Sequence, residues 1–226
     1  MAIIDYRPTK DTFIADDAPT SNLNGFGLRT GVAIGPAVRR TLMHFDLADF
    51  PEYTSIDDAD LTVTVNQDGI LDVEAYVHRI TQTGWIEAQA SWNNYATGSA
   101  WASPGGDYDL TTPAPVQWFQ PATATHLTIT GLADFVRDAL DHRSRQLHIL
   151  LKQADEGFTA LEYRYLDREA EDLTSSSLPR LRIIYTRPAA ADRIIDDPRV
   201  TLGAAAPTRS ARSATPAAAA RPARPG

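Results

Sequence analysis

Three tryptophans lie close together in the middle of the chain, at Trp85, Trp92 and Trp101, in a stretch rich in glycine and proline. Asn93 and Asp107 lie in the same stretch. An aromatic ring can cover the apolar face of a pyranose while amide and carboxylate groups bond its hydroxyls. These five residues are therefore candidate carbohydrate-binding residues. The alternative is that the tryptophans close the end of a hydrophobic core, which is the more common role of such residues.

A second candidate lies at residues 163–169, where aromatic and charged side chains alternate. In a strand, Tyr163 and Tyr165 would share one face with Asp167. Such a face could bind a sugar, and the same alternation suits an ordinary ladder of cross-strand ion pairs. Both interpretations stay open for Tyr163 and Tyr165.

Oxygen donors gather near the N-terminus, in what we expect to be the first loop. Asp11, Asp16 and Asp17 are followed there by Asn22 and Asn24. A structural calcium ion takes about six to eight oxygen ligands, and these residues could supply part of that set. No Asp-x-Asp-x-Asp-Gly loop is present, and solvated acids or Asx-turns explain the same residues without a metal. Calcium is thus an open possibility, and no other cofactor is expected.

The residue types that carry catalysis form no recognisable constellation. The chain has no cysteine, which removes disulfides, thiolate metal sites and thiol nucleophiles. It also has no Gly-x-Ser-x-Gly elbow, no His-Glu-x-x-His and no phosphate-binding glycine loop. The acidic residues neither propose nor exclude the facing carboxylate pair of a glycosidase. We expect a protein that is not an enzyme, with a polysaccharide-degrading enzyme as an alternative.

The elements that must position these residues are predicted to be strands. Between positions 39 and 185, apolar residues recur mainly with period two in short runs bounded by turn-forming residues. One segment, 132–140, has its apolar residues on one helical stripe and predicts a two-turn helix. This pattern indicates an all-β, antiparallel, jelly-roll-like sandwich with one short helix. The clearest strands are expected at 41–47, 60–65, 71–77, 126–130, 146–152 and 180–185.

The amino-acid composition changes after Tyr185. We expect a sandwich domain at 1–186 and an Ala-, Pro- and Arg-rich extended arm at 187–226, flexible unless a partner binds it. Ile194 and Ile195 belong to a small apolar island that could dock on a partner. The basic residues of the arm are Arg209, Arg212, Arg221 and Arg224.

Charge is distributed unevenly along the chain. The net charge is −8, and residues 203–226 carry four arginines and no acid, which leaves −12 for the rest. An acidic body disfavours nucleic-acid binding, because phosphate contacts need clustered Lys and Arg. The N-terminal residues lack the pattern of a secretory signal, and no segment is apolar for long enough to cross a bilayer. We therefore expect neither nucleic-acid binding by the body nor membrane insertion.

Several motifs occur in a fixed order over residues 11–185. They are Asp11–Ile14, Asn24–Gly25, Arg40–Leu47, Ala59–Val63, Trp85–Glu87, Ala90–Asn94, Trp101, Gly105–Asp107, the helical stretch after Leu132, Ile149–Lys152, Tyr163–Glu169 and Leu178–Tyr185. In this order they resemble the DNRLRE-type domain, a β-sandwich family related to carbohydrate-binding modules of bacterial surface and secreted proteins. The resemblance implies a binding or structural module that brings no catalytic residues.

The resemblance also suggests phage particles, in which domains of this type would serve as decoration, fibre or adhesion elements. The resemblance therefore implies a non-catalytic structural or adhesion subunit of a phage-like particle. We expect it on the virion surface, attached to other subunits through the C-terminal arm. The alternative is a free carbohydrate-binding module, extracellular or on a cell surface, that recognises a bacterial surface polysaccharide.

Overall fold

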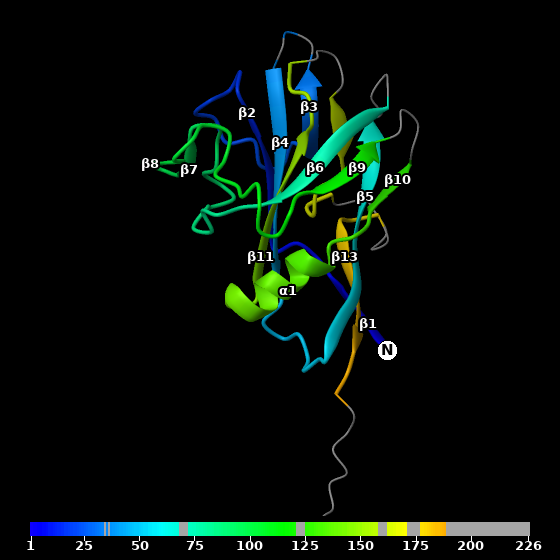
Figure 1. The fold of residues 1–226 in the computed structure, drawn as a ribbon. Helices are drawn as coiled ribbons and strands as arrows, with labels where there is room; N and C mark the ends of the chain where they lie inside the picture. The colour runs from blue at the N-terminus through cyan, green and yellow to red at the C-terminus, as the bar shows by residue number, and fades with distance from the viewer. Residues whose placement is uncertain are drawn as a thin grey trace, which may run out of the picture. The chain divides into compact units, whose positions relative to one another are not determined.

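The structure is a computed structural model that describes residues 1–33, 35, 37–67, 72–120, 125–157, 162–170 and 177–188. The described residues belong to one compact unit, Met1–Ala189. The arm residues singled out above, from Ile194 to Arg224, lie outside the described part. Figure 1 shows the arrangement of the strands.

The strands form two groups, and every strand pairing among the described residues is antiparallel. The first group, sheet A, orders its strands β1, β13, β5 and β10. The second group, sheet B, is built around β4, which pairs with β2, β3 and β11. Strand β11 then pairs with β6, and β6 pairs with β9. The bounds in sheet A are β1 Ala2–Tyr6, β5 Ser55–Gln67, β10 His126–Ile129 and β13 Arg180–Thr186. Those in sheet B are β2 Lys10–Ala15, β3 Leu28–Ala33, β4 Ala37–Asp46, β6 Val73–Arg79, β9 Val116–Gln120 and β11 Gln146–Gln153.

A short strand and a helix complete the sandwich. Strand β12 (Tyr163–Tyr165) pairs with β3 on one side and β5 on the other, and so joins sheet B to sheet A. Helix α1 (Ala133–His142) buries Phe135, Val136 and Ala139. It ends where Ser144 and Arg145 take positive φ values of 53° and 64° and Arg145 N–H bonds the Ala139 carbonyl.

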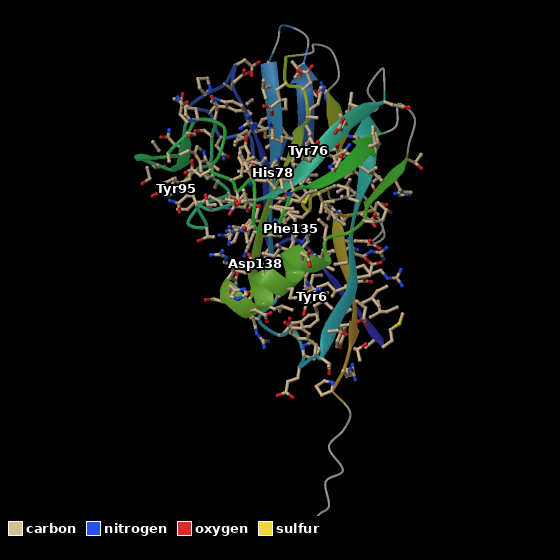
Figure 2. All side chains as sticks on the ribbon, in the orientation of Figure 1. Tyr6, Tyr76, His78, Tyr95, Phe135 and Asp138 are labelled. Atoms are coloured by element: carbon tan, nitrogen blue, oxygen red, sulfur yellow. The ribbon has the colours of Figure 1, made fainter. Side chains whose placement is uncertain are left out.

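The main core lies between the two sheets, because alternate residues of facing strands point inward. Leu61 and Val63 of β5 contribute from sheet A, and Ile149 and Leu151 of β11 contribute from sheet B. Phe135 on α1 adds an aromatic ring (Figure 2). Each fully buried side chain of this size stabilises the fold by about 1.5–3 kcal/mol.

A second, smaller core covers the outer face of sheet B. Leu42 of β4 and Leu150 of β11 alternate with main-core residues, so they point away from sheet A and pack against Trp85 and Trp101. The covering segment is residues 80–109, which contains the short hairpin of β7 (Asn94–Ala96) and β8 (Ser99–Ala100). The remaining buried members of this second core are Ile14, Ile80 and Ala90, with Trp92, Tyr95 and Tyr108 partly buried against it.

The antiparallel β-sandwich and its short helix are confirmed by the structure. Each strand expected from period-two patterns is present within a few residues, and α1 overlaps the expected helix. One expectation needs correction. Trp85 and Trp101 do have a core role, but in a second core on the outer face of sheet B and not at the end of the main core. Among the described residues, no helix combines the length and apolarity needed to span a bilayer.

Candidate functional site

Arg40 is the centre of a polar and aromatic cluster on the outer face of sheet B. Its guanidinium forms two bonds to Glu156, Nε to Oε1 at 2.8 Å and Nη2 to Oε2 at 2.7 Å. Nη1 donates to the Gly105 carbonyl at 2.7 Å. The guanidinium also lies 4.8 Å from the Trp92 ring and 5.5 Å from the Tyr108 ring. A planar cation held in this way is rigid and keeps both rings in place.

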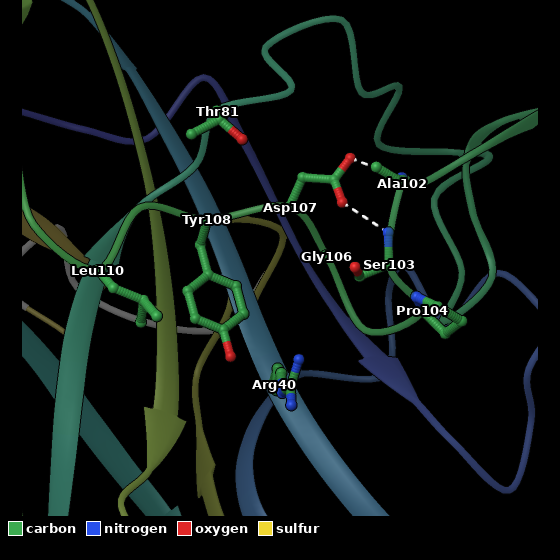
Figure 3. A pocket seen from close by; sticks show the side chains of 9 residues that line it. All are labelled: Arg40, Thr81, Ala102, Ser103, Pro104, Gly106, Asp107, Tyr108 and Leu110. Atoms are coloured by element: carbon green, nitrogen blue, oxygen red, sulfur yellow. Dashed lines mark hydrogen bonds between the residues drawn. The ribbon is translucent and has the colours of Figure 1, made fainter.

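A pocket opens beside this cluster, with a volume of about 460 Å³. Figure 3 shows Tyr108 and Arg40 lying along one side, with the loop of Ser103 and Pro104 opposite. Asp107 holds that loop, because its carboxylate accepts the backbone N–H groups of Ala102 at 2.8 Å and Ser103 at 2.9 Å. The remaining lining residues are Thr81, Ala102, Gly106 and Leu110. We call this the Arg40–Tyr108 pocket.

A second pocket of about 460 Å³ adjoins it, and Thr81 lines both. Lys10, Arg79 and Arg143 bring three cationic side chains to its wall, and none of its lining residues is acidic. The other lining residues are His44, Thr83, Ser144, Gln146 and His148. We call this the basic pocket, and the two pockets together the groove. Lys10, Arg79 and Arg143 bring positive charge to the basic pocket although the body of the chain is acidic overall.

The cations of the basic pocket differ in how they are neutralised. Arg79 pairs with Asp109, and with Asp138 at 3.4 Å, and Arg143 also pairs with Asp138, at 3.2 Å. Lys10 Nζ donates to the Trp85 carbonyl at 3.3 Å and lies over the Trp85 ring. Among the described residues, no carboxylate lies within ion-pair distance of Lys10. Its charge is therefore available to a ligand.

Two buried histidines form the floor of the basic pocket. The His44 and His148 rings stack with centroids 4.1 Å apart. Trp85 Nε1–H donates to His148 Nδ1 at 3.0 Å, which requires that Nδ1 carry no proton. Burial, followed by the neighbouring His44 and Lys10, lowers the pKa of His148 to about 3. Burial also lowers the pKa of His44. Both rings are neutral at physiological pH.

The tryptophan candidates separate in the structure. Trp85 is fully buried, with 0% exposure, and Trp101 is buried and donates Nε1–H to the Ser91 carbonyl. Neither ring offers a face to a sugar in this conformation. Trp92 and Asn93 are partly buried, and Asp107 lines the groove through the loop that it holds. Of these five candidates, Trp92 belongs to the cluster around Arg40, and Asp107 lines the pocket beside it.

Tyr163 and Tyr165 alternate with Arg164 as expected, but they point inward. Both rings are about 99% buried in the main core, so they are not on a sugar-binding face. The burial follows from the position of β12 between β3 and β5, which turns this strand face toward the core. Beside them, Glu162 pairs with Arg164 at 2.6 Å and, across to β3, with Arg29 at 3.4 Å. The ion-pair interpretation fits this arrangement.

The expected calcium residues are also separated. Asp11 lies in β2, not in a loop, and is fully buried. Asp16 accepts the Val38 backbone N–H at 2.8 Å, and Asp17 forms two bonds to Arg39. The structure instead brings Asp11 close to Glu87 and Glu169. Burial, followed by the Glu169 charge, raises the pKa of Asp11 to about 8.

Sequence reasoning missed most of the groove. Arg40, Lys10, Arg79 and Tyr108 lie far apart in the chain, and each looks like an ordinary strand or loop residue. Strand β4 offered one signal, because Arg39-Arg40 places two cations in a strand that is buried along most of its length. A cation in the centre of a buried strand needs partners, and those partners define the pocket.

Comparison with known proteins adds a family relation. Residues 2–105 match the model of carbohydrate-binding module family 96. The match supports a carbohydrate-binding β-sandwich-type domain, and the family is one of binding modules that are generally non-catalytic. The matched region includes β1 to β6 and most of the segment that forms the Arg40–Tyr108 pocket. No individual curated protein matches the chain.

Proposed function

We propose that this chain binds an extended glycan in the groove on the outer face of sheet B. The observation that carries the proposal is that the Arg40–Tyr108 pocket and the basic pocket adjoin at Thr81. Together they offer room for more than one sugar residue. The family match to residues 2–105 supports carbohydrate binding independently of this geometry.

The Arg40–Tyr108 pocket has the chemistry that sugar rings need. Tyr108 supplies an aromatic ring, and Leu110 next to it is 65% exposed. Thr81 and Ser103 are exposed and offer hydroxyl groups that can donate and accept hydrogen bonds. The guanidinium of Arg40 fixes the Tyr108 ring, which reduces the entropy lost on binding.

The basic pocket favours a glycan that carries negative charge. Lys10, Arg79 and Arg143 line it. Arg79 and Arg143 already pair with Asp109 and Asp138, whereas no carboxylate among the described residues lies within ion-pair distance of Lys10. Carboxylate or sulfate groups of a polysaccharide would form charge-assisted hydrogen bonds with these cations. A neutral glycan would leave the ammonium group of Lys10 without a strong partner. We therefore propose an acidic polysaccharide as the ligand class.

The test is binding of the full chain to an array of neutral, uronic-acid and sulfated glycans. Lys10→Gln and Tyr108→Ala should each weaken binding to an acidic glycan by about tenfold or more, equivalent to about 1.4 kcal/mol. Matched controls are Arg182→Gln, an exposed cation on sheet A, and Phe119→Ala, a ring that is 65% exposed. Unchanged binding by both groove variants, or equal loss in the controls, would refute the assignment of the site.

A second part of the proposal concerns where the protein is displayed and how it is attached. We propose that the sandwich is displayed on the surface of a phage-like particle and attached through residues 187–226, so that glycan binding serves adhesion. The acid-free run of four arginines in 203–226 and the resemblance to the DNRLRE-type domain support this role. A free module on a cell surface is the alternative. In that case the chain would bind glycan equally well but would not co-purify with particles.

A further inference from the structure

Three carboxylates from separate parts of the chain meet at the free edge of β2. Asp11 lies in β2, Glu87 in the segment that covers sheet B, and Glu169 a few residues after β12. One oxygen from each lies within 4.8 Å of the others. Oxygen ligands on opposite sides of a calcium ion are about 4.6–5.2 Å apart, since each bond is about 2.3–2.6 Å. The three oxygens are thus close enough to share one ion.

A single guanidinium faces these three carboxylates. Arg168 Nε and Nη2 donate to Glu87 Oε1 at 3.0 Å and Oε2 at 2.7 Å, and Nη2 also contacts Glu169 Oε1 at 2.7 Å. The Asp11 carboxylate accepts the backbone N–H of Arg168 at 3.0 Å, through Oδ2. Ionised, the group has a charge of −2 after Arg168 is counted. Arg168 alone does not neutralise it.

Buried oxygens without partners point to a ligand that the protein itself does not supply. Asp11 is fully buried, and its Oδ1 has no hydrogen-bond partner among the described residues. Glu169 Oε2 is in the same condition. Asn24 Oδ1 is also buried and unpartnered, on a loop that Asn22 ties to the Glu87 carbonyl by a 2.7 Å hydrogen bond. Leaving such acceptors unmatched is costly, and a cation satisfies them together.

We propose that Asp11, Glu87 and Glu169 bind a divalent metal ion, calcium. The donors are all oxygen, which suits a hard cation. Calcium fits better than magnesium, because magnesium binds few protein ligands and keeps most of its water. This site is structural and lies outside the glycan groove.

The ion would fasten three segments that are distant in sequence. Glu87 Oε1 already accepts the Asp11 backbone N–H at 2.7 Å, so the covering segment is hydrogen-bonded to the edge of β2. The chain after β12 contributes Glu169 to the same place. Calcium bound there stabilises the attachment of residues 80–109 to sheet B, and with it one wall of the Arg40–Tyr108 pocket.

The test compares thermal unfolding of the full chain in EDTA and in millimolar calcium chloride. Calcium should raise the unfolding midpoint by several degrees, because a ligand that binds the folded state stabilises it. Terbium should replace calcium and luminesce on tryptophan excitation, since Trp85 is two residues from Glu87. Added calcium should then quench that signal by competition.

Three variants decide which residues bind the ion. Asp11→Asn and Glu169→Gln should each abolish the calcium-dependent rise and the terbium signal. Asp17→Asn is the matched control, because Asp17 was expected from the sequence to bind calcium but pairs with Arg39 instead. It should keep both responses. If Asp11→Asn does not fold, Glu169→Gln, which replaces a less buried side chain, decides alone.

Several results would overturn the site. The wild-type chain could show neither a calcium-dependent midpoint nor terbium luminescence. Asp17→Asn could abolish the response while Glu169→Gln keeps it, which would place the ion in the turn after β2. Magnesium at the same concentration could raise the midpoint as much as calcium, which would exclude calcium selectivity. Loss of glycan binding alone would not contradict this site, because the unfolding midpoint and terbium luminescence do not measure glycan binding.

Discussion

Gly105 lies where the backbone passes closest to the Arg40 cluster, with a φ of +91°. A Cβ atom there would lie 2.5 Å from Arg40 Nη1 and 2.8 Å from the Trp92 ring. We therefore expect Gly105→Ala to lower the free energy of unfolding for two reasons. Left-handed backbone costs about 1–2 kcal/mol, and the steric conflict adds about 1–3 kcal/mol. Urea unfolding of the full chain measures the sum.

Gly98→Ala is the matched control for that experiment. Gly98 also has a positive φ, +74°, but a Cβ atom there would meet nothing within 4 Å. It should show the backbone cost alone and keep full glycan affinity. Gly105→Ala should also weaken glycan binding, since Arg40 and Trp92 must move. Equal destabilisation by the two substitutions would contradict the packing of Gly105 against Arg40.

The buried His148 makes stability depend on pH. Its pKa is about 3 in the folded chain and about 6.5 in an unfolded one, so the unfolded state binds the proton first. The contribution of neutral His148 is complete above about pH 6.5 and is lost as pH falls toward 3. Taken alone, His148 contributes a slope that approaches about 1.4 kcal/mol per pH unit in this window, while the raised pKa of Asp11 contributes a slope of opposite sign. Urea unfolding at pH 7, 6 and 5 measures it.

Variants separate this effect from the titration of carboxylates. His148→Gln should remove the contribution of His148 to the slope between pH 6.5 and 5 and leave that of His44, although it lowers stability at pH 7 by breaking the bond from Trp85 Nε1. His126→Gln should keep the slope, because His126 is exposed on β10. If His148→Gln retains the wild-type slope, the proton enters elsewhere.

At the scale of elements, the segment 80–109 is a covering layer and not a free loop. Trp85 is fully buried against sheet B and also bonds His148. We expect Trp85→Ala to lower the free energy of unfolding by about 3–5 kcal/mol. Phe119→Ala, at an exposed ring on β9, should change it by less than about 0.5 kcal/mol. Chemical denaturation followed by circular dichroism distinguishes the two.

The strands were predictable where their side chains alternate between core and solvent. Leu61, Val63 and the polar residues between them show that pattern in β5. The covering role of the segment 80–109 was not predictable, because β4 and β11 are buried on both faces. Leu42 and Leu150 then look like ordinary core residues, and the pattern does not show which layer each one meets.

The candidate site was less predictable than the fold. Trp85 and Trp101 attracted attention as aromatic residues in a loop, yet the second core buries them. Arg40, Lys10 and Arg79 come together only through the pairing of β2, β4, β11 and β6, which joins residues far apart in sequence. Asp11 was recognised as an oxygen donor, but its neighbours Glu87 and Glu169 come from other elements.

At the scale of the whole molecule, the region that matches family 96 is not a separate folding unit. Residues 1–105 lack β11, the partner of β4, and β13, the partner of β5. A fragment of residues 1–105 should therefore be unfolded by circular dichroism and by amide chemical-shift dispersion. A fragment of residues 1–189 should fold with the stability of the full chain, since the compact unit is Met1–Ala189. A cooperative unfolding transition in the shorter fragment would contradict this.

The pairing of β13 has a mechanical consequence. This strand is bonded on both sides, to β1 along Leu181–Tyr185 and to β5 along Arg180–Thr186. Consider a force applied at Thr186 along the strand and opposed by a polymer bound in the groove. This force would strain all of these hydrogen bonds at once, because they run perpendicular to the strands. They would have to rupture nearly together. A tether that leaves the sandwich at Thr186 would thus load these hydrogen bonds in shear, the direction in which a pair of strands resists force best.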